Sequence, residues 1–130
     1  MAHFQTLFSK YDRLVLLDTE TTGLQFARDE IIEFAAVAVE LRDGEATVVA
    51  EYDELVALNP GGFVPPKIQE LTGISTQDLR ERGIPKTRVC RDIAELIQGN
   101  TLLLQGPQQL WSRRLFRSPF SPARIVSSSF

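Results

Sequence analysis

Cysteine and histidine are almost absent from this chain, whose 130 residues include one of each, Cys90 and His3. A single cysteine excludes an intramolecular disulfide and a zinc site built from cysteines, so we expect Cys90 to be a small core residue. His3 precedes every predicted strand, where a mobile N-terminus is a better interpretation than a catalytic group. Neither residue supports redox or structural-metal chemistry.

Long hydrophobic runs are absent as well. No apolar stretch approaches the roughly 20 residues that a membrane span requires, and residues 1–12 lack the basic and apolar regions of a signal peptide. Hydrophobic residues make up 43% of the chain and charged residues 24%, which is ordinary for a globular domain and excludes a collagen-like or disordered chain. We therefore expect a soluble, cytoplasmic protein with no membrane partner.

Acidic residues are missing from the C-terminal part. Residues 105–130 carry four arginines and no Asp or Glu, a net charge of +4, whereas residues 1–104 carry a net charge of −7. The segment is also rich in Ser and Pro, and no helical or strand periodicity persists in it. We place a boundary at Leu104, which divides the chain into a domain, residues 1–104, and an Arg/Ser/Pro-rich tail, residues 105–130.

The domain begins with strands. Leu14 to Leu17 form a continuous apolar run that ends at Asp18, which is typical of a central strand buried on both faces. Residues 31–41 and 47–58 read as two further strands, and Asp43-Gly44 between them is a strong hairpin signal.

Helices follow, after the proline-containing break at residues 59–66. Ser75 and Asp78 resemble a capping box that opens a short helix, which Gly83 and Pro85 end. Apolar residues at helical spacing predict a second helix capped by Gly99: Val89, Ile93, Leu96 and Ile97. Residues 101–104 read as a fourth strand. The order β-β-β-α-α-β predicts an α/β fold with a mixed sheet, in which the first strand is central and the fourth lies parallel beside it.

Two carboxylates stand at the end of the first strand. Side chains alternate along a strand, so Asp18 and Glu20 point to the same face. Two carboxylates aimed together repel each other unless a cation lies between them, and oxygen ligands without nearby cysteine or histidine suit Mg²⁺ or Mn²⁺. The alternative is a pair of strand-end carboxylates that simply face water.

The surrounding sequence resembles a known family. Val-Leu-Leu-Asp-Thr-Glu-Thr-Thr-Gly-Leu at 15–24 closely resembles the first motif of the DnaQ-like (DEDD) 3′-5′ exonucleases, of the proofreading epsilon-subunit type. Residues 30–37 are similar to that family's second strand, and residues 64–74 to its loop and helix ending in Thr-Gly-Ile. The resemblance covers about residues 12–104.

The resemblance implies an RNase H-like exonuclease fold and hydrolysis of a 3′-terminal phosphodiester with two divalent metals, Mg²⁺ or Mn²⁺. It implies that Asp18 and Glu20 are catalytic metal ligands, and that Thr21, Thr22 and Leu24 line the pocket for the terminal nucleotide. Loop hydrogen bonding for the two threonines, and core packing for Leu24, are the alternatives. The implied partners are the 3′ end of single-stranded DNA or RNA and, for a proofreading domain, a DNA polymerase.

The chain departs from the family after Leu104. The family has an Asn-x-x-Phe-Asp string there and later a His with an Asp, but the last acidic residue here is Glu95. Asp92 precedes the fourth strand and is a poor replacement. With two of four carboxylates and no general base, we expect a C-terminally truncated domain that binds metal weakly or singly and is inactive or nearly so. The alternative function is a non-catalytic remnant that binds nucleic acid or a polymerase.

A truncated sheet would also leave apolar surface open, so we expect marginal stability or aggregation. The tail offers apolar residues that could partly cover that surface: Leu110, Trp111, Leu115, Phe116 and Phe120. Another interpretation of the tail is that its arginines contact the phosphates of a nucleic acid. The alternative is that these charges are only solvated. The abrupt change after Leu104 is also what a frame slip would produce. Alternative splicing, a rearrangement close to the stop codon and a natural short paralogue are further origins for the tail.

Overall fold

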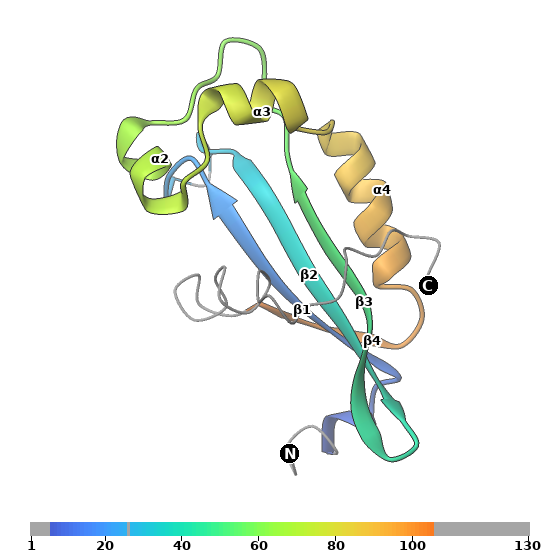
Figure 1. Cartoon of the computed structure of the whole chain (residues 1–130). Coiled ribbons are helices and arrows are strands. Elements are labelled where there is room, and N and C mark those ends of the chain that lie inside the picture. The colour runs from blue at the N-terminus through green and yellow to red at the C-terminus, as the bar shows by residue number, and fades with distance from the viewer. Residues whose placement is uncertain (1–5, 26, 106–130) are drawn as a thin grey trace.

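The computed structural model describes residues 6–25 and 27–105 and contains a mixed four-stranded sheet in the order β3-β2-β1-β4 (Figure 1). The strands are β1 (Arg13–Thr21), β2 (Ile31–Arg42), β3 (Glu45–Leu55) and β4 (Thr101–Gln105). β2 is antiparallel to both β1 and β3, and β4 is parallel to β1. The α/β class, the central first strand and the parallel fourth strand are thus confirmed.

The β2–β3 hairpin turns on two residues. Asp43 and Gly44 have φ angles of 53° and 81°, the left-handed conformations that a tight hairpin turn requires and that Asp-Gly supplies. Because the turn is so short, β3 begins at Glu45, two residues earlier than predicted.

Three helices, rather than two, connect β3 to β4: α2 (Pro66–Thr72), α3 (Thr76–Arg82) and α4 (Lys86–Leu96). The residue pattern alone does not indicate α2, because Pro65 and Pro66 are typical of a break in a helix or strand. Pro66 instead opens the helix, where its missing N–H has no intrahelical partner to lose, and Gly73 ends it with a φ of 74°. The family resemblance did indicate a helix at this position.

The two predicted helices are present. Ser75 and Asp78 form the predicted capping box of α3, with each side chain accepting a hydrogen bond from the other residue's backbone N–H. The predicted cap of α4 was wrong by two residues: the helix ends at Leu96 with Ile97 as its cap, and Gly99, with a φ of 72°, turns the chain afterwards.

The helices cover the sheet unevenly (Figure 1). α4 runs along one face, where Val89 and Leu96 pack on Val15 and Leu17 of β1. The opposite face is covered by Leu7, Phe8 and Tyr11, which pack against Leu14 and Leu16. α2 and α3 lie beyond the carboxyl end of β1, where Ile32, Val64, Ile74 and Leu79 form a third cluster.

Cys90 is exposed, which contradicts the core position predicted for it. Helical periodicity explains the difference, because Val89, Ile93 and Leu96 supply the contacts of α4 with the sheet and Cys90 lies beside that stripe. No helix in the described ranges is long and apolar enough to cross a membrane. His3 and the tail residues from 106 onward lie outside the described residues.

Candidate active site

Asp18 and Glu20 lie on the same face of β1, as predicted. Leu17 packs on the α4 side of the sheet and Leu16 on the opposite side, so alternation places Asp18 and Glu20 on the face away from α4. Asp18 is 5% exposed, and Glu20 is half-buried. The two carboxylates therefore leave the strand at its carboxyl end, next to buried apolar side chains.

Glu33 is a third carboxylate on this face, which the sequence interpretation did not single out. It lies directly opposite Glu20 in the β1–β2 register and is 5% exposed. Directly opposite residues of antiparallel strands project to the same side, so Glu33 shares the face of Glu20. The register that brings them together changes at the next position, where Thr21 pairs with Ile31.

The loop after β1 is held together by Asp29. Its Oδ1 accepts a hydrogen bond from the Thr22 hydroxyl at 3.1 Å, and its Oδ2 accepts one from the Gln25 backbone N–H at 2.7 Å. The Thr22 hydroxyl in turn accepts from the Glu30 backbone N–H at 2.9 Å. The hydrogen bond from the Gln25 N–H is the largest influence on the pKa of Asp29 and lowers it; desolvation opposes this shift, but Thr22 and the nearby Arg28 add to the lowering, and the net shift is downward. The carboxylate thus fixes both ends of the loop.

Hydrogen bonds from Lys86 connect this loop to α4. The Lys86 ammonium donates to Glu30 Oε1 at 2.8 Å, to the Ala57 carbonyl at 2.9 Å and to Asn59 Oδ1 at 3.2 Å. Burial raises the pKa of Glu30, but the hydrogen bonds from Lys86 and Asn59 outweigh it, and the net shift is downward. The end of the site loop is therefore anchored to the first turn of α4.

Two of the three residues proposed for the nucleotide pocket lie on the other side of the sheet from the carboxylates. Thr21 and Leu24 line a cavity of 780 Å³ together with Leu17 and Thr19, which places that cavity on the α4 side of the sheet. The Thr21 hydroxyl donates to the Gly23 carbonyl at 2.7 Å, so both threonines make the loop hydrogen bonds expected from the alternative interpretation. Leu24 is 94% exposed, so core packing is wrong for it.

Asp18 and Glu20 fit a hard divalent cation as a partial ligand set, because both present oxygen donors at one strand end. Within the described ranges, no group of three or more His, Cys, Asp or Glu side chains is arranged to hold a metal ion. Asp92 is engaged elsewhere, accepting a hydrogen bond from the Tyr52 hydroxyl at 2.8 Å, which agrees with its rejection as a replacement ligand.

Gly23 gives a first prediction about the site loop. A Cβ at this position would lie 2.5 Å from Asp29 Oδ2, too close for real atoms, so Gly23→Ala must displace the Asp29 carboxylate. Losing its hydrogen bonds should destabilise the loop by about 1 kcal/mol. We expect faster amide hydrogen exchange at Gln25, measured by NMR, with exchange in β2 unchanged. Unchanged exchange at Gln25 would show that the carboxylate does not hold the loop.

The sequence profile of the RNase T family, a family of exonucleases, matches residues 15–109 of the chain. The chain belongs to this exonuclease family. The match includes β1 from residue 15 onward, the site loop, the other three strands and the connecting helices, so the DnaQ-like resemblance of the first motif is confirmed as membership of the family.

Relatives agree over the same region. The chain is 36% identical over 89 residues to the 3′-5′ exonuclease DinG of Bacillus subtilis, covering 67% of this chain and 9% of that protein. It is 38% identical over 61 residues to DNA polymerase III subunit epsilon of Aquifex aeolicus, covering 47% of this chain and 27% of the subunit. The chain therefore spans only a small part of these relatives.

Solved structures support the fold. Exonuclease I of E. coli, crystallised with a dT13 oligonucleotide, superposes with a TM-score of 0.62 at 24% identity, covering 72% of this chain and 20% of that one. At this identity the similarity concerns the fold alone, and it confirms the RNase H-like exonuclease fold in the part that the chain contains.

Proposed function

We propose that this chain carries the first-motif part of a divalent-metal 3′-5′ exonuclease site for the 3′ end of single-stranded DNA or RNA, and that the chain alone is inactive or nearly so. The observation that carries the proposal is the placement of Asp18 and Glu20 on one face, at the carboxyl end of the central strand of an exonuclease-family sheet. The relatives that are exonucleases or polymerase subunits support the substrate class.

The chemistry follows from the carboxylates. Asp18 and Glu20 would hold Mg²⁺ or Mn²⁺, which when bound activates water and stabilises negative charge on phosphate oxygens. Burial of Asp18, together with the adjacent carboxylates on its face, makes the negative charge of this strand end costly without a cation. With two of the family's four carboxylates, we propose weak and single metal binding.

The test of the metal site is a metal-dependent gain in stability. Thermal unfolding of the full chain is measured in EDTA and in a Mn²⁺ series. A site that binds only the folded chain should add about 1.4 kcal/mol at ten times its dissociation constant. We expect Asp18→Asn to abolish this gain and also to stabilise the chain in EDTA, because it removes a buried negative charge near Glu20.

Glu70→Gln is the matched control, since Glu70 is an exposed acidic residue on α2 and is not one of the carboxylates on the β1–β2 face. It should keep the full response to Mn²⁺. A response of the same size in Asp18→Asn would contradict the proposed ligand role of Asp18, whatever the nuclease activity of the chain.

A further inference from the structure

We propose that residues 106–130, the part of the chain's own tail that follows β4, bind in the apolar groove between α4 and the sheet. The groove consists of the 780 Å³ cavity described above and a 510 Å³ cavity along α4, which share Asp29, Ile31, Phe34 and Ile93. Because four lining residues are common to both cavities, the two form one continuous hollow, here called the α4 groove. This proposal is independent of the proposed nuclease site.

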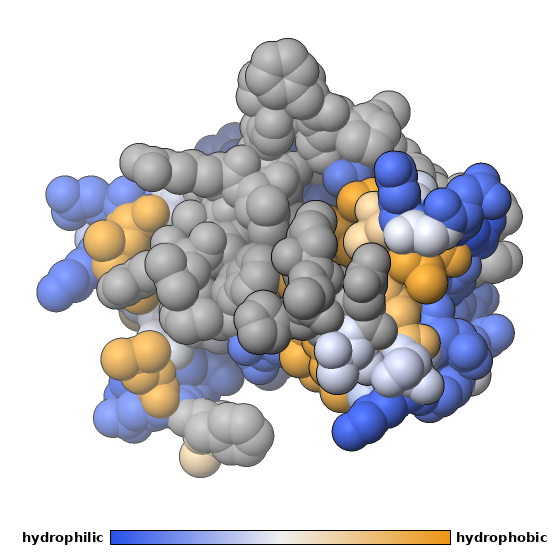
Figure 2. Space-filling model, turned by 90° about the horizontal axis from the view of Figure 1, so that it is seen from below, coloured by the Kyte–Doolittle hydropathy of each residue, from blue (hydrophilic) through white to orange (hydrophobic). Residues whose placement is uncertain are grey.

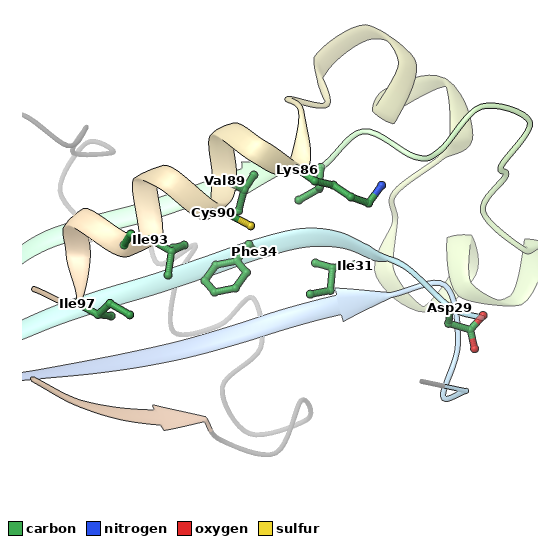
Figure 3. A pocket seen from close by; sticks show the side chains of 10 residues that line it. Asp29, Ile31, Phe34, Lys86, Val89, Cys90, Ile93 and Ile97 are labelled. Carbon is green, nitrogen blue, oxygen red and sulfur yellow. The ribbon is translucent and has the colours of Figure 1, made fainter. Parts of the chain in front are cut away.

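The α4 groove is apolar and open. Figure 3 shows Cys90 and Ile93 of α4 on the side of the helix that faces the sheet, and Ile31 and Phe34 of β2 lining the same cavity. Four large hydrophobic residues that line it are exposed, namely Leu24 at 94%, Leu103 at 45%, Ile31 at 38% and Ile97 at 36%. Hydrophobic patches are also visible between hydrophilic regions when the molecule is viewed from below (Figure 2). Apolar surface of this kind is typical of a binding face.

The position at which the chain leaves the sheet favours the tail as the occupant. Gln105 ends β4 and itself lines the α4 groove, as does Leu103 two residues earlier. The next 25 residues therefore start at the groove. Trp111 lies six residues beyond Gln105, within about 20 Å even for a fully extended chain. Attachment at the groove raises the effective concentration of the tail there above that of any separate partner.

Composition and charge also fit. The tail contains large apolar residues within one short stretch: Leu110, Trp111, Leu115, Phe116 and Phe120. Its net charge is +4 with no acidic residue, whereas residues 1–104 carry −7. Opposite net charges favour association, while the aromatic side chains would fill the apolar hollow. A tail bound in this way would replace water over Ile93 and Phe34.

The chain carries its own reporters, because Trp111 is its only tryptophan and Cys90 its only cysteine. In the full chain, we expect Trp111 emission to be blue-shifted and weakly quenched by acrylamide. Leu103→Asp places a charge in the α4 groove and should red-shift the emission and increase quenching severalfold. Leu41→Asp is the control, since Leu41 is also a strand leucine, with 43% exposure against 45% for Leu103, but lies outside the groove. Equal spectra for both variants and the unchanged chain would overturn the proposal.

A second measurement substitutes only tail residues and leaves the folded domain unchanged. It therefore tests the proposal even if the Leu103→Asp variant does not fold. The rate of reaction of Cys90 with Ellman's reagent is compared between the full chain and the double variant Trp111→Ser, Phe116→Ser. A bound tail shields Cys90, so the double variant should react severalfold faster, while Phe130→Ser should not. Equal rates in the full chain and the double variant would overturn the proposal. Protection that grows with protein concentration would also overturn it, because the occupant would then be a second copy.

Discussion

Replacing Leu96 with alanine is expected to lower the free energy of unfolding by about 3 kcal/mol, within the range of about 2 to 5 kcal/mol for buried leucines. Leu96 is fully buried at the end of α4, in the cluster that contains Val15 and Leu17 of β1. The loss combines the transfer free energy of the removed methyl groups with the cavity that they leave. The effect is large because a domain of this size has a total stability of only about 5 to 15 kcal/mol.

Backbone contacts at the same position limit relaxation around such a cavity. Arg13 Nη1 donates to the Leu96 carbonyl at 3.0 Å, and its Nη2 forms a 2.6 Å ion pair with Glu40. The helix end is therefore tied to β1 and β2 and is restrained from moving inward to fill the space. Urea unfolding followed by circular dichroism measures the change, with the dependence on urea concentration expected to stay constant.

Leu71→Ala on α2 is the matched control, because Leu71 is a helical leucine that is 70% exposed. Its effect should be within about 0.5 kcal/mol. Equal losses for the two variants would mean that α4 is not anchored by Leu96. The same pair tests the expectation of marginal stability, since a low midpoint for the unchanged chain would leave Leu96→Ala unfolded without denaturant.

Local patterns predicted the strands well. Asp43-Gly44 determined the hairpin turn through two left-handed residues, and the apolar run at Leu14 to Leu17 identified the central strand. Strand alternation was sufficient to place Asp18 and Glu20 on one face. These features depend on neighbours in the sequence, so they can be derived from the sequence without the tertiary structure.

Features that depend on pairing between distant residues were harder to predict. Glu33 faces Glu20 only in one register, and that register shifts at the next pair, so no local signal identifies it. The anchoring role of Asp29 depends on a loop that folds back on Thr22. Leu24 belongs to the first motif but is exposed at the loop, which no hydrophobicity pattern predicts.

The exposure of Cys90 has a related cause. A small, apolar residue beside a helical stripe is usually buried by whatever packs on that side of the helix. Here the neighbouring surface is the α4 groove, which the described residues leave open. The amphipathic pattern predicted the contacts of α4 with the sheet correctly, but it carries no information about what covers the flank of the helix.

The full chain is expected to release mononucleotides at least about 10² to 10⁴ times more slowly than a complete exonuclease, the usual effect of losing a general base. The sequence provides no acidic residue after Glu95 and no histidine besides His3, so the proposed site has two carboxylates with which to bind metal and orient water. Loss of a second ion would lower the rate further. The measurement follows labelled single-stranded DNA and RNA in Mg²⁺ or Mn²⁺, with E. coli Exonuclease I assayed in parallel.

Asp18→Ala separates the chain's own residual rate from a contaminating nuclease, because it should remove whatever metal-dependent release the chain has, while Glu70→Gln should leave it intact. A rate within tenfold of the reference enzyme that disappears in Asp18→Ala would contradict the proposed inactivity and establish that two carboxylates suffice. Binding of the same oligonucleotides in EDTA, with no release in metal, would instead support the non-catalytic alternative. In that case Asp18→Ala should leave the affinity for the oligonucleotides unchanged. This one substitution therefore distinguishes a nucleic-acid-binding remnant from a weakened nuclease.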